Sequence, residues 1–264
     1  MKKILISVIP DLIALNVPAQ DWAKARLENS PRHHEWVKVK SGDREVNCYI
    51  TYPEVKDKAP VVLVIHEIFG LTDWARSVTD ELAENGYIAI APDLLSGMVP
   101  GGGGTAETGG NEAALKLVSA LPPAQVTADL NAAANYAVKL PSANGKLAVV
   151  GFCWGGGQSF RYAANNADLK AAYVFYGPTP SQSDIAKINC PVYGFYAGND
   201  ARITATVPKT VELMKQEKKA FEPVIYDGAG HGFMRAGEAP DANAANKKAH
   251  DEAWTRLKEL LKKL

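Results

Sequence analysis

Short hydrophobic runs alternate with longer amphipathic stretches along most of the chain. Residues 61–65 form an unbroken aliphatic run, which is typical of a strand buried on both faces of a mostly parallel sheet. A helix is predicted over residues 72–84, with Thr72 as its cap and Gly86 as its stop signal, and the next strand over residues 87–91. This segment therefore predicts a βαβ unit whose first strand is central.

The same alternation continues to the C-terminus. Further strands are predicted over residues 146–150, 171–175, 192–196 and 221–226, and further helices over residues 112–120, 124–140, 158–164, 207–219 and 241–261. Upstream, strand-like runs at residues 35–40 and 45–52 flank the turn signal Ser41-Gly42-Asp43, so they predict a hairpin. The pattern favours an α/β fold with a mostly parallel, doubly wound sheet and an N-terminal hairpin.

A glycine-rich stretch at residues 95–110 interrupts the alternation, with Gly101 to Gly104 in a row. This composition predicts a flexible loop without helix or strand, because glycine stabilises neither. Since the loop follows the end of a strand, we expect it to border a substrate pocket, and the alternative is a solvated excursion. Further on, Asn144-Gly145 predicts a turn that leads into the strand at residues 146–150.

Length, composition and charge fit one domain, which we expect to span residues 20–264. Lys plus Arg equal Asp plus Glu at 29 each, so no excess positive charge is available to bind nucleic acid or an anionic membrane. The cysteines, at positions 48, 153 and 190, are too few and too scattered for a disulfide scaffold or a CxxC-type metal site. We therefore expect no nucleic-acid, membrane or metal partner.

Residues 1–19 have some features of an export signal and others that oppose it. Two lysines precede an apolar run that ends at Ala19, but Pro10 and Asp11 interrupt this run. Two hypotheses stay open: a cleaved signal peptide on a periplasmic or secreted protein, or an N-terminal extension packed on a cytoplasmic one. No other stretch reaches the roughly 18 apolar residues that a membrane span needs.

The clearest chemical signal is the segment GFCWGGG at residues 151–157, between a predicted strand and a predicted helix. It matches the nucleophile elbow G-x-S-x-G of α/β-hydrolases, with Cys153 in place of the serine. Its glycines permit a tight turn, and the dipole of the following helix favours a thiolate. Cys153 is therefore the candidate nucleophile. The alternatives are a buried structural cysteine and a phosphate-binding loop.

A base and an acid follow the elbow in the order that α/β-hydrolases use. Asp200 comes just after the strand at residues 192–196, and His231 comes just after the strand at residues 221–226. Open α/β sheets build their sites at these strand ends. His231 would take the thiol proton and Asp200 would hold the imidazole ring, while the alternatives are a turn-forming Asp200 and an ordinary loop histidine.

An oxyanion hole needs two backbone N–H groups, one of them from the residue after the nucleophile. Trp154 is that residue. For the second donor we predict Ile68, because the segment HEIFG at residues 66–70 follows an early strand of the sheet. The alternative for His66 and Glu67 is plain polar termination of that strand.

These motifs resemble the dienelactone hydrolase (carboxymethylenebutenolidase) family of α/β-hydrolases. The residues that carry the resemblance are HEIFG at 66–70, APDL at 91–94, GFCWGG at 151–156, the Asp200 loop and GHGF at 230–233. The resemblance covers the chain from about residue 35 to the C-terminus. It implies a triad of Cys153, His231 and Asp200, no metal or organic cofactor, and a monomer.

The resemblance also implies roles for three further residues. Glu67 would be the gate that is associated with the resting thiol and moves when substrate binds, and a carboxylate near sulfur does disfavour the thiolate. Arg235 and Phe69 would contact the substrate, although Arg235 could instead be a surface ion-pair residue. The family's second substrate arginine has no match, since no arginine lies between Arg76 and Arg161.

The sequence thus predicts a hydrolase that cleaves a small ester or lactone through an acyl-cysteine intermediate. The same three side chains also serve thioesterases, peptidases and acyltransferases. A noncatalytic homologue that binds a ligand, and a redox-sensing cysteine, are the alternatives outside acyl transfer.

Overall fold

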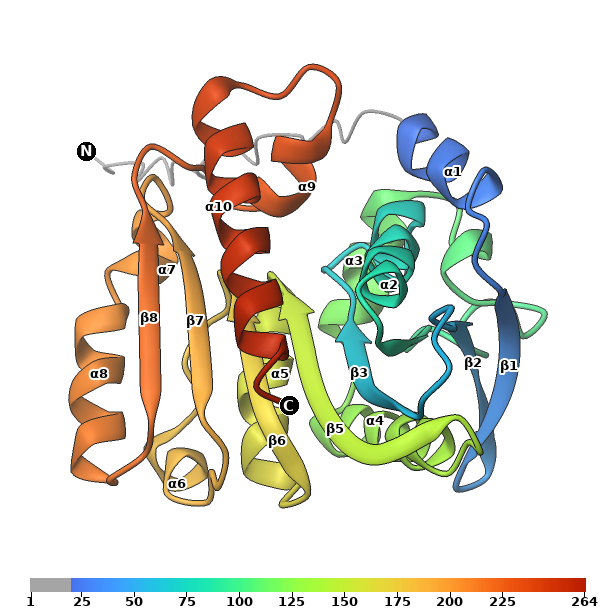
Figure 1. Ribbon diagram of the computed structural model, residues 1–264, viewed down its shortest axis with the longest axis horizontal. Helices are drawn as coiled ribbons and strands as arrows, with labels where there is room; N and C mark the ends of the chain where they lie inside the picture. The colour runs from blue at the N-terminus through green and yellow to red at the C-terminus, as the bar shows by residue number, and fades with distance from the viewer. Residues whose placement is uncertain (1–19) are drawn as a thin grey trace, which may run out of the picture.

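The computed structural model describes residues 20–264, so both hypotheses on residues 1–19 lie outside the described part of the chain. Eight strands form one sheet in the order β1-β2-β4-β3-β5-β6-β7-β8 (Figure 1). Their bounds are β1 His34–Ser41, β2 Arg44–Thr51, β3 Ala59–Ile65, β4 Ile88–Pro92, β5 Ala143–Phe152, β6 Leu169–Phe175, β7 Val192–Ala197 and β8 Phe221–Tyr226. Strand β2 is antiparallel to β1 and β4, and the other neighbours are parallel. The predicted α/β fold with its N-terminal hairpin is confirmed.

Helices cover both faces of this sheet. One face carries α1 Asp21–Glu28, α2 Asp73–Glu84, α9 Phe233–Glu238 and α10 Ala244–Leu261, and the other carries α3 Asn111–Ser119, α4 Pro123–Val138, α5 Trp154–Asn165, α6 Gln182–Ile185 and α8 Val207–Gln216. In β3, Val61 and Leu63 belong to the core on one face, while Val62 and Val64 belong to the core on the other. All four are fully buried, and burial of each contributes roughly 1.5–3 kcal/mol.

Some boundaries differ from the predictions for local reasons. Asn144-Gly145 lies inside β5 and not before it, because Ala143 already pairs with Ala59 of β3 and the turn, with Gly145 at a positive φ of 83°, becomes a bulge in the strand. The helix predicted from residue 158 already begins at Trp154, directly after the elbow. Helices α1, α6 and α9, and the short helix α7 Ala201–Thr204, were not predicted. Only Ala23 and Leu27 of α1 are buried, and two apolar positions are too few to mark a helix in the sequence.

The glycine-rich loop is more ordered than predicted. Asp93, at the end of β4, accepts hydrogen bonds from the Thr105 amide and hydroxyl, each at 2.7 Å, and the Thr105 hydroxyl accepts one from the Leu71 amide at 2.9 Å. The segment Thr105–Glu107 forms a 3₁₀ turn. The prediction of a loop without any helix is therefore wrong at this turn, because one polar side chain supplies the order that the glycines do not.

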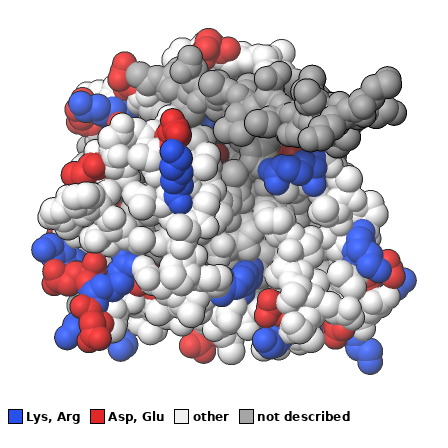
Figure 2. Space-filling view, turned by 180° about the vertical axis from the view of Figure 1, so that it is seen from behind, with Lys and Arg blue, Asp and Glu red and all other residues white. Residues whose placement is uncertain are grey.

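The surface of the described chain agrees with its balanced composition. Acidic and basic side chains are intermingled on the face opposite to that of Figure 1 (Figure 2). Within residues 20–264, no helix combines the length and the apolar character needed to cross a bilayer.

Candidate active site

Cys153 occupies a strained turn between β5 and α5. Its backbone has φ 56° and ψ −116°, and its amide donates to the Phe175 carbonyl at 3.0 Å. A Cβ at Gly155 would lie 2.3 Å from the His66 carbonyl oxygen, and one at Gly151 would lie 2.0 Å from the Gly155 carbonyl oxygen. Glycine is thus required on both sides of Cys153, as the elbow motif predicts.

His231 lies between the sulfur of Cys153 and the carboxylate of Asp200. Its Nδ1 is 2.5 Å from Asp200 Oδ2, and its Nε2 is 3.0 Å from Cys153 Sγ. A carboxylate only accepts, so Nδ1 carries the ring proton and Nε2 can accept the thiol proton. Asp200 comes from the end of β7, at the start of α7 Ala201–Thr204, and His231 from the end of β8. The structure therefore brings the three predicted side chains together.

The surroundings of Cys153 keep its sulfur protonated at rest. Burial raises the pKa of Cys153 to about 12, and the negative charge of Glu67 acts in the same direction. The backbone amides of Trp154 and Ile68 and the positive charge of Arg202 act in the opposite direction and lower that pKa. Both amides that the sequence predicts as oxyanion donors thus act on the pKa of this thiol, whereas Arg202 was not predicted.

Glu67 forms its ion pair with Arg235 and not a hydrogen bond with the sulfur of Cys153. Arg235 Nε donates to Glu67 Oε2 at 2.8 Å, and the guanidinium carbon lies 5.8 Å from the centre of the Phe69 ring. Arg235 is therefore an ion-pair residue, as the alternative to a substrate contact holds, but with 19% of its side chain exposed the pair is mostly buried and not on the surface. The three residues predicted as gate and substrate contacts therefore form one group beside the elbow.

Tyr176 is a site residue that sequence reasoning missed. Its fully buried ring meets the His231 ring edge-on, with 5.0 Å between centroids, and its backbone takes a positive φ of 38°. Burial raises the pKa of Tyr176 well above its usual value, and the charge of Glu67 adds to the effect, so the hydroxyl stays neutral. Tyr176 directly follows β6 outside any motif, and only Gly177 beside it could have marked a tight turn.

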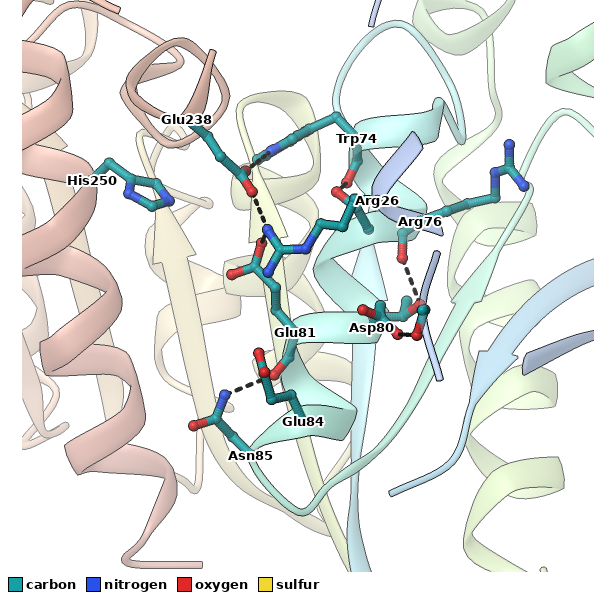
Figure 3. Close-up of polar contacts among 12 residues, drawn as sticks. Arg26, Trp74, Arg76, Asp80, Glu81, Glu84, Asn85, Glu238 and His250 are labelled. Atoms are coloured by element: carbon teal, nitrogen blue, oxygen red, sulfur yellow. Dashed lines mark hydrogen bonds and ion pairs between the residues drawn. The ribbon is translucent and has the colours of Figure 1, made fainter. Parts of the chain in front are cut away.

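An ion-pair cluster fixes α9, the helix that carries Arg235. Glu238 accepts from Trp74 Nε1 at 3.0 Å and pairs with Arg26, which also pairs with Glu81 of α2 (Figure 3). Burial raises the pKa of Glu81 well above its usual value, and the nearby charge of Glu238 adds to this. Residues of α1 and α2 thereby hold α9 in place behind the Glu67–Arg235 pair.

A cavity of about 760 Å³ lies between the loop after β3, the start of α2 and the glycine-rich loop. Its lining includes Phe69, Arg76, Glu107 and Trp36 but not Cys153. Arg76 is paired with Asp73. Because Phe69 follows Ile68, the cavity reaches the loop that carries the predicted second oxyanion donor, and the glycine-rich loop forms one of its walls. In the described part of the chain, no cluster of three or more His, Cys, Asp or Glu side chains is arranged to hold a metal ion.

The sheet order and the strand–elbow–helix geometry place the chain among the α/β-hydrolases. Within that class it belongs to the dienelactone hydrolase family, whose model matches residues 46–264. A Salmonella typhi protein named "Putative carboxymethylenebutenolidase" is 35% identical over 242 residues, which cover 84% of each chain. An Escherichia coli K12 protein of the same name is 35% identical over 236 residues, which cover 81% of each chain.

Solved structures agree with this assignment. The crystal structure of a "Putative Dienelactone Hydrolase" from Klebsiella pneumoniae superposes with a TM-score of 0.77 at 28% identity, covering 88% of this chain and 99% of that one. A more distant solved structure shares the fold alone. An acylaminoacyl peptidase from Pyrococcus horikoshii has a TM-score of 0.66 at 14% identity, covering 88% of this chain and 41% of that one.

Proposed function

We propose that this protein hydrolyses a small carboxylic ester or lactone through an acyl-enzyme intermediate on Cys153. The observation that carries the proposal is the position of His231, which lies 2.5 Å from Asp200 and 3.0 Å from the elbow sulfur. The names of the relatives, carboxymethylenebutenolidase and dienelactone hydrolase, support a lactone as one of the substrates.

Acylation begins when His231 Nε2 takes the proton of Cys153 and the sulfur attacks the substrate carbonyl carbon. The amides of Ile68 and Trp154 then stabilise the oxyanion of the tetrahedral intermediate. His231 returns the proton to the leaving oxygen, the C–O bond breaks, and the acyl group stays on Cys153. Asp200 stabilises the imidazolium that exists between these two proton transfers.

Deacylation repeats these steps with water as the nucleophile in place of the thiol. His231 takes a proton from water, the hydroxide attacks the acyl-cysteine carbonyl, and the C–S bond breaks as the proton returns to sulfur. The products are a carboxylic acid and the free thiol. All of these groups come from one chain, so we expect a monomer to be competent and no metal or organic cofactor to be needed.

We infer that Glu67 and Arg235 link substrate binding to formation of the thiolate. Arg235 binds Glu67 at rest, and a substrate carboxylate near Phe69 would compete for the same guanidinium. A change in the position of Glu67 would alter the charge that now raises the pKa of Cys153. With no arginine between Arg76 and Arg161, a substrate with one negative charge, or none, fits this site better than a doubly charged one.

A substrate panel tests the proposal. Wild type and Cys153→Ala are compared on p-nitrophenyl esters, lactones, thioesters and anilides. Turnover of esters and lactones by wild type, lost in the variant, supports the proposal, while faster turnover of thioesters or anilides would favour a thioesterase or peptidase. Ligand binding without turnover of any activated ester would favour a noncatalytic homologue.

A further inference from the structure

His66, at the end of β3, makes a contact that strand termination does not explain. The residue is fully buried, and its Nδ1 lies 2.7 Å from the carbonyl oxygen of Glu67. Because a carbonyl only accepts, Nδ1 must carry a proton. Burial lowers the pKa of His66, so the ring is neutral and its single proton is on Nδ1.

The carbonyl that His66 binds belongs to the peptide unit whose N–H is that of Ile68. This unit is planar, with the carbonyl oxygen and the amide hydrogen on opposite sides. The His66 bond, together with the longer one that the Gly70 amide donates to the same oxygen at 3.2 Å, therefore fixes the direction of the Ile68 N–H. That N–H acts on the Cys153 sulfur and lowers the pKa of the thiol.

The same histidine also contacts Trp154, whose amide is the other predicted oxyanion donor. Its ring stacks on the ring of Trp154, with 5.6 Å between centroids and 15° between planes. A Cβ on Gly155 would lie 2.3 Å from the His66 carbonyl oxygen, so the loop after β3 and the start of α5 are in van der Waals contact.

We propose that His66 is a positioning residue for the oxyanion hole, and that it acts through its Nδ1–H bond to the Glu67 carbonyl. The proposal rests on the proposed acyl-transfer function for its catalytic consequence. Its structural consequence, the aim of the Ile68 amide at Cys153, does not depend on turnover.

Two substitutions separate the hydrogen bond from the ring contact. His66→Phe keeps a flat ring against Trp154 but removes the hydrogen-bond donor. If the phenylalanine variant does not fold, His66→Leu, which also lacks the donor, is used in its place. His66→Asn loses the ring but keeps an N–H donor at the δ position, within reach of the Glu67 carbonyl. Far-UV circular dichroism and thermal midpoints establish that each variant is folded.

The experiment measures kcat/KM on p-nitrophenyl acetate together with the pH dependence of Cys153 alkylation by iodoacetamide. Loss of an oxyanion donor costs about 10²–10³-fold in rate, so a misaimed amide in the Phe or Leu variant should cost roughly 10-fold or more. Alkylation of that variant should also be slower at each pH, because the sulfur loses part of a hydrogen bond that lowers its pKa. In His66→Asn both quantities should recover to within about 3-fold of wild type.

Equal losses in the Phe (or Leu) and Asn variants would overturn the proposal, as would wild-type values in both. If wild type hydrolyses no activated ester, the proposed function fails. The alkylation profiles then still decide the role of His66, because they need no turnover.

Discussion

Replacing Glu67 with glutamine should make Cys153 more reactive toward alkylation. In the native protein the Glu67 carboxylate is, after burial, the second cause that raises the pKa of Cys153 to about 12. Glutamine has almost the same shape, and its carbonyl can still accept from Arg235 Nε. The substitution therefore removes the negative charge with little other change and leaves the positive charge of Arg235 in place.

The size of the effect follows from charge interactions at short range. A charge within about 4–6 Å shifts a pKa by roughly 1–3 units, and we take the lower end because the charge of Glu67 ranks below burial among the causes that raise the pKa of Cys153. Well below the pKa, a fall of one unit raises the thiolate fraction about tenfold, which corresponds to roughly 1.4 kcal/mol. Alkylation of the Glu67→Gln variant at pH 8 should thus be about ten times faster than that of wild type.

The assay follows iodoacetamide labelling of the peptide that contains Cys153, since Cys48 and Cys190 are buried. Glu222→Gln is the matched control, because Glu222 pairs with Arg256 at an exposed position of β8. Its labelling rate should equal that of wild type. An unchanged or slower rate in Glu67→Gln would refute the electrostatic account of the resting thiol.

Three further predictions concern other contacts. Asp200→Asn should lower kcat/KM by about 10³–10⁴-fold on p-nitrophenyl acetate, because the imidazole loses its orienting carboxylate. Arg26→Met should lower the free energy of unfolding by about 2–4 kcal/mol at pH 7 in urea titrations. The loss should shrink toward pH 4.5, because the folded pKa of Glu81 is raised, so protonation relieves its repulsion from Glu238. Thr105→Val should cost about 1–3 kcal/mol in the same titration, since Asp93 loses a buried donor; an unchanged midpoint would contradict the role of that loop contact.

The chemistry of the site was predictable where a local pattern and the topology agree. Cys153, Asp200 and His231 each follow a strand-like run, and the carboxyl ends of parallel strands meet at one edge of a sheet. The order of the motifs therefore indicates that the three side chains converge. Glycines at the elbow carry the same information, because the turn leaves no room for a Cβ.

Other parts of the site depend on contacts between distant segments. Arg26 and Glu238 are 212 positions apart, and neither has a neighbouring pattern that marks it. Tyr176 meets His231 only because β6 ends beside the elbow, which no motif in its own segment indicates. The role of His66 depends on the direction of one carbonyl, and this direction is a property of the folded loop.

The most direct test of the account is detection of an acyl group on Cys153. Wild type is mixed with p-nitrophenyl acetate, quenched in acid within the first turnovers and digested for mass spectrometry. The account predicts a burst of p-nitrophenol of about one equivalent and an acetylated peptide that contains Cys153, both absent from Cys153→Ala. Full esterase activity in Cys153→Ala, or an acetyl group on another residue of an active enzyme, would contradict it.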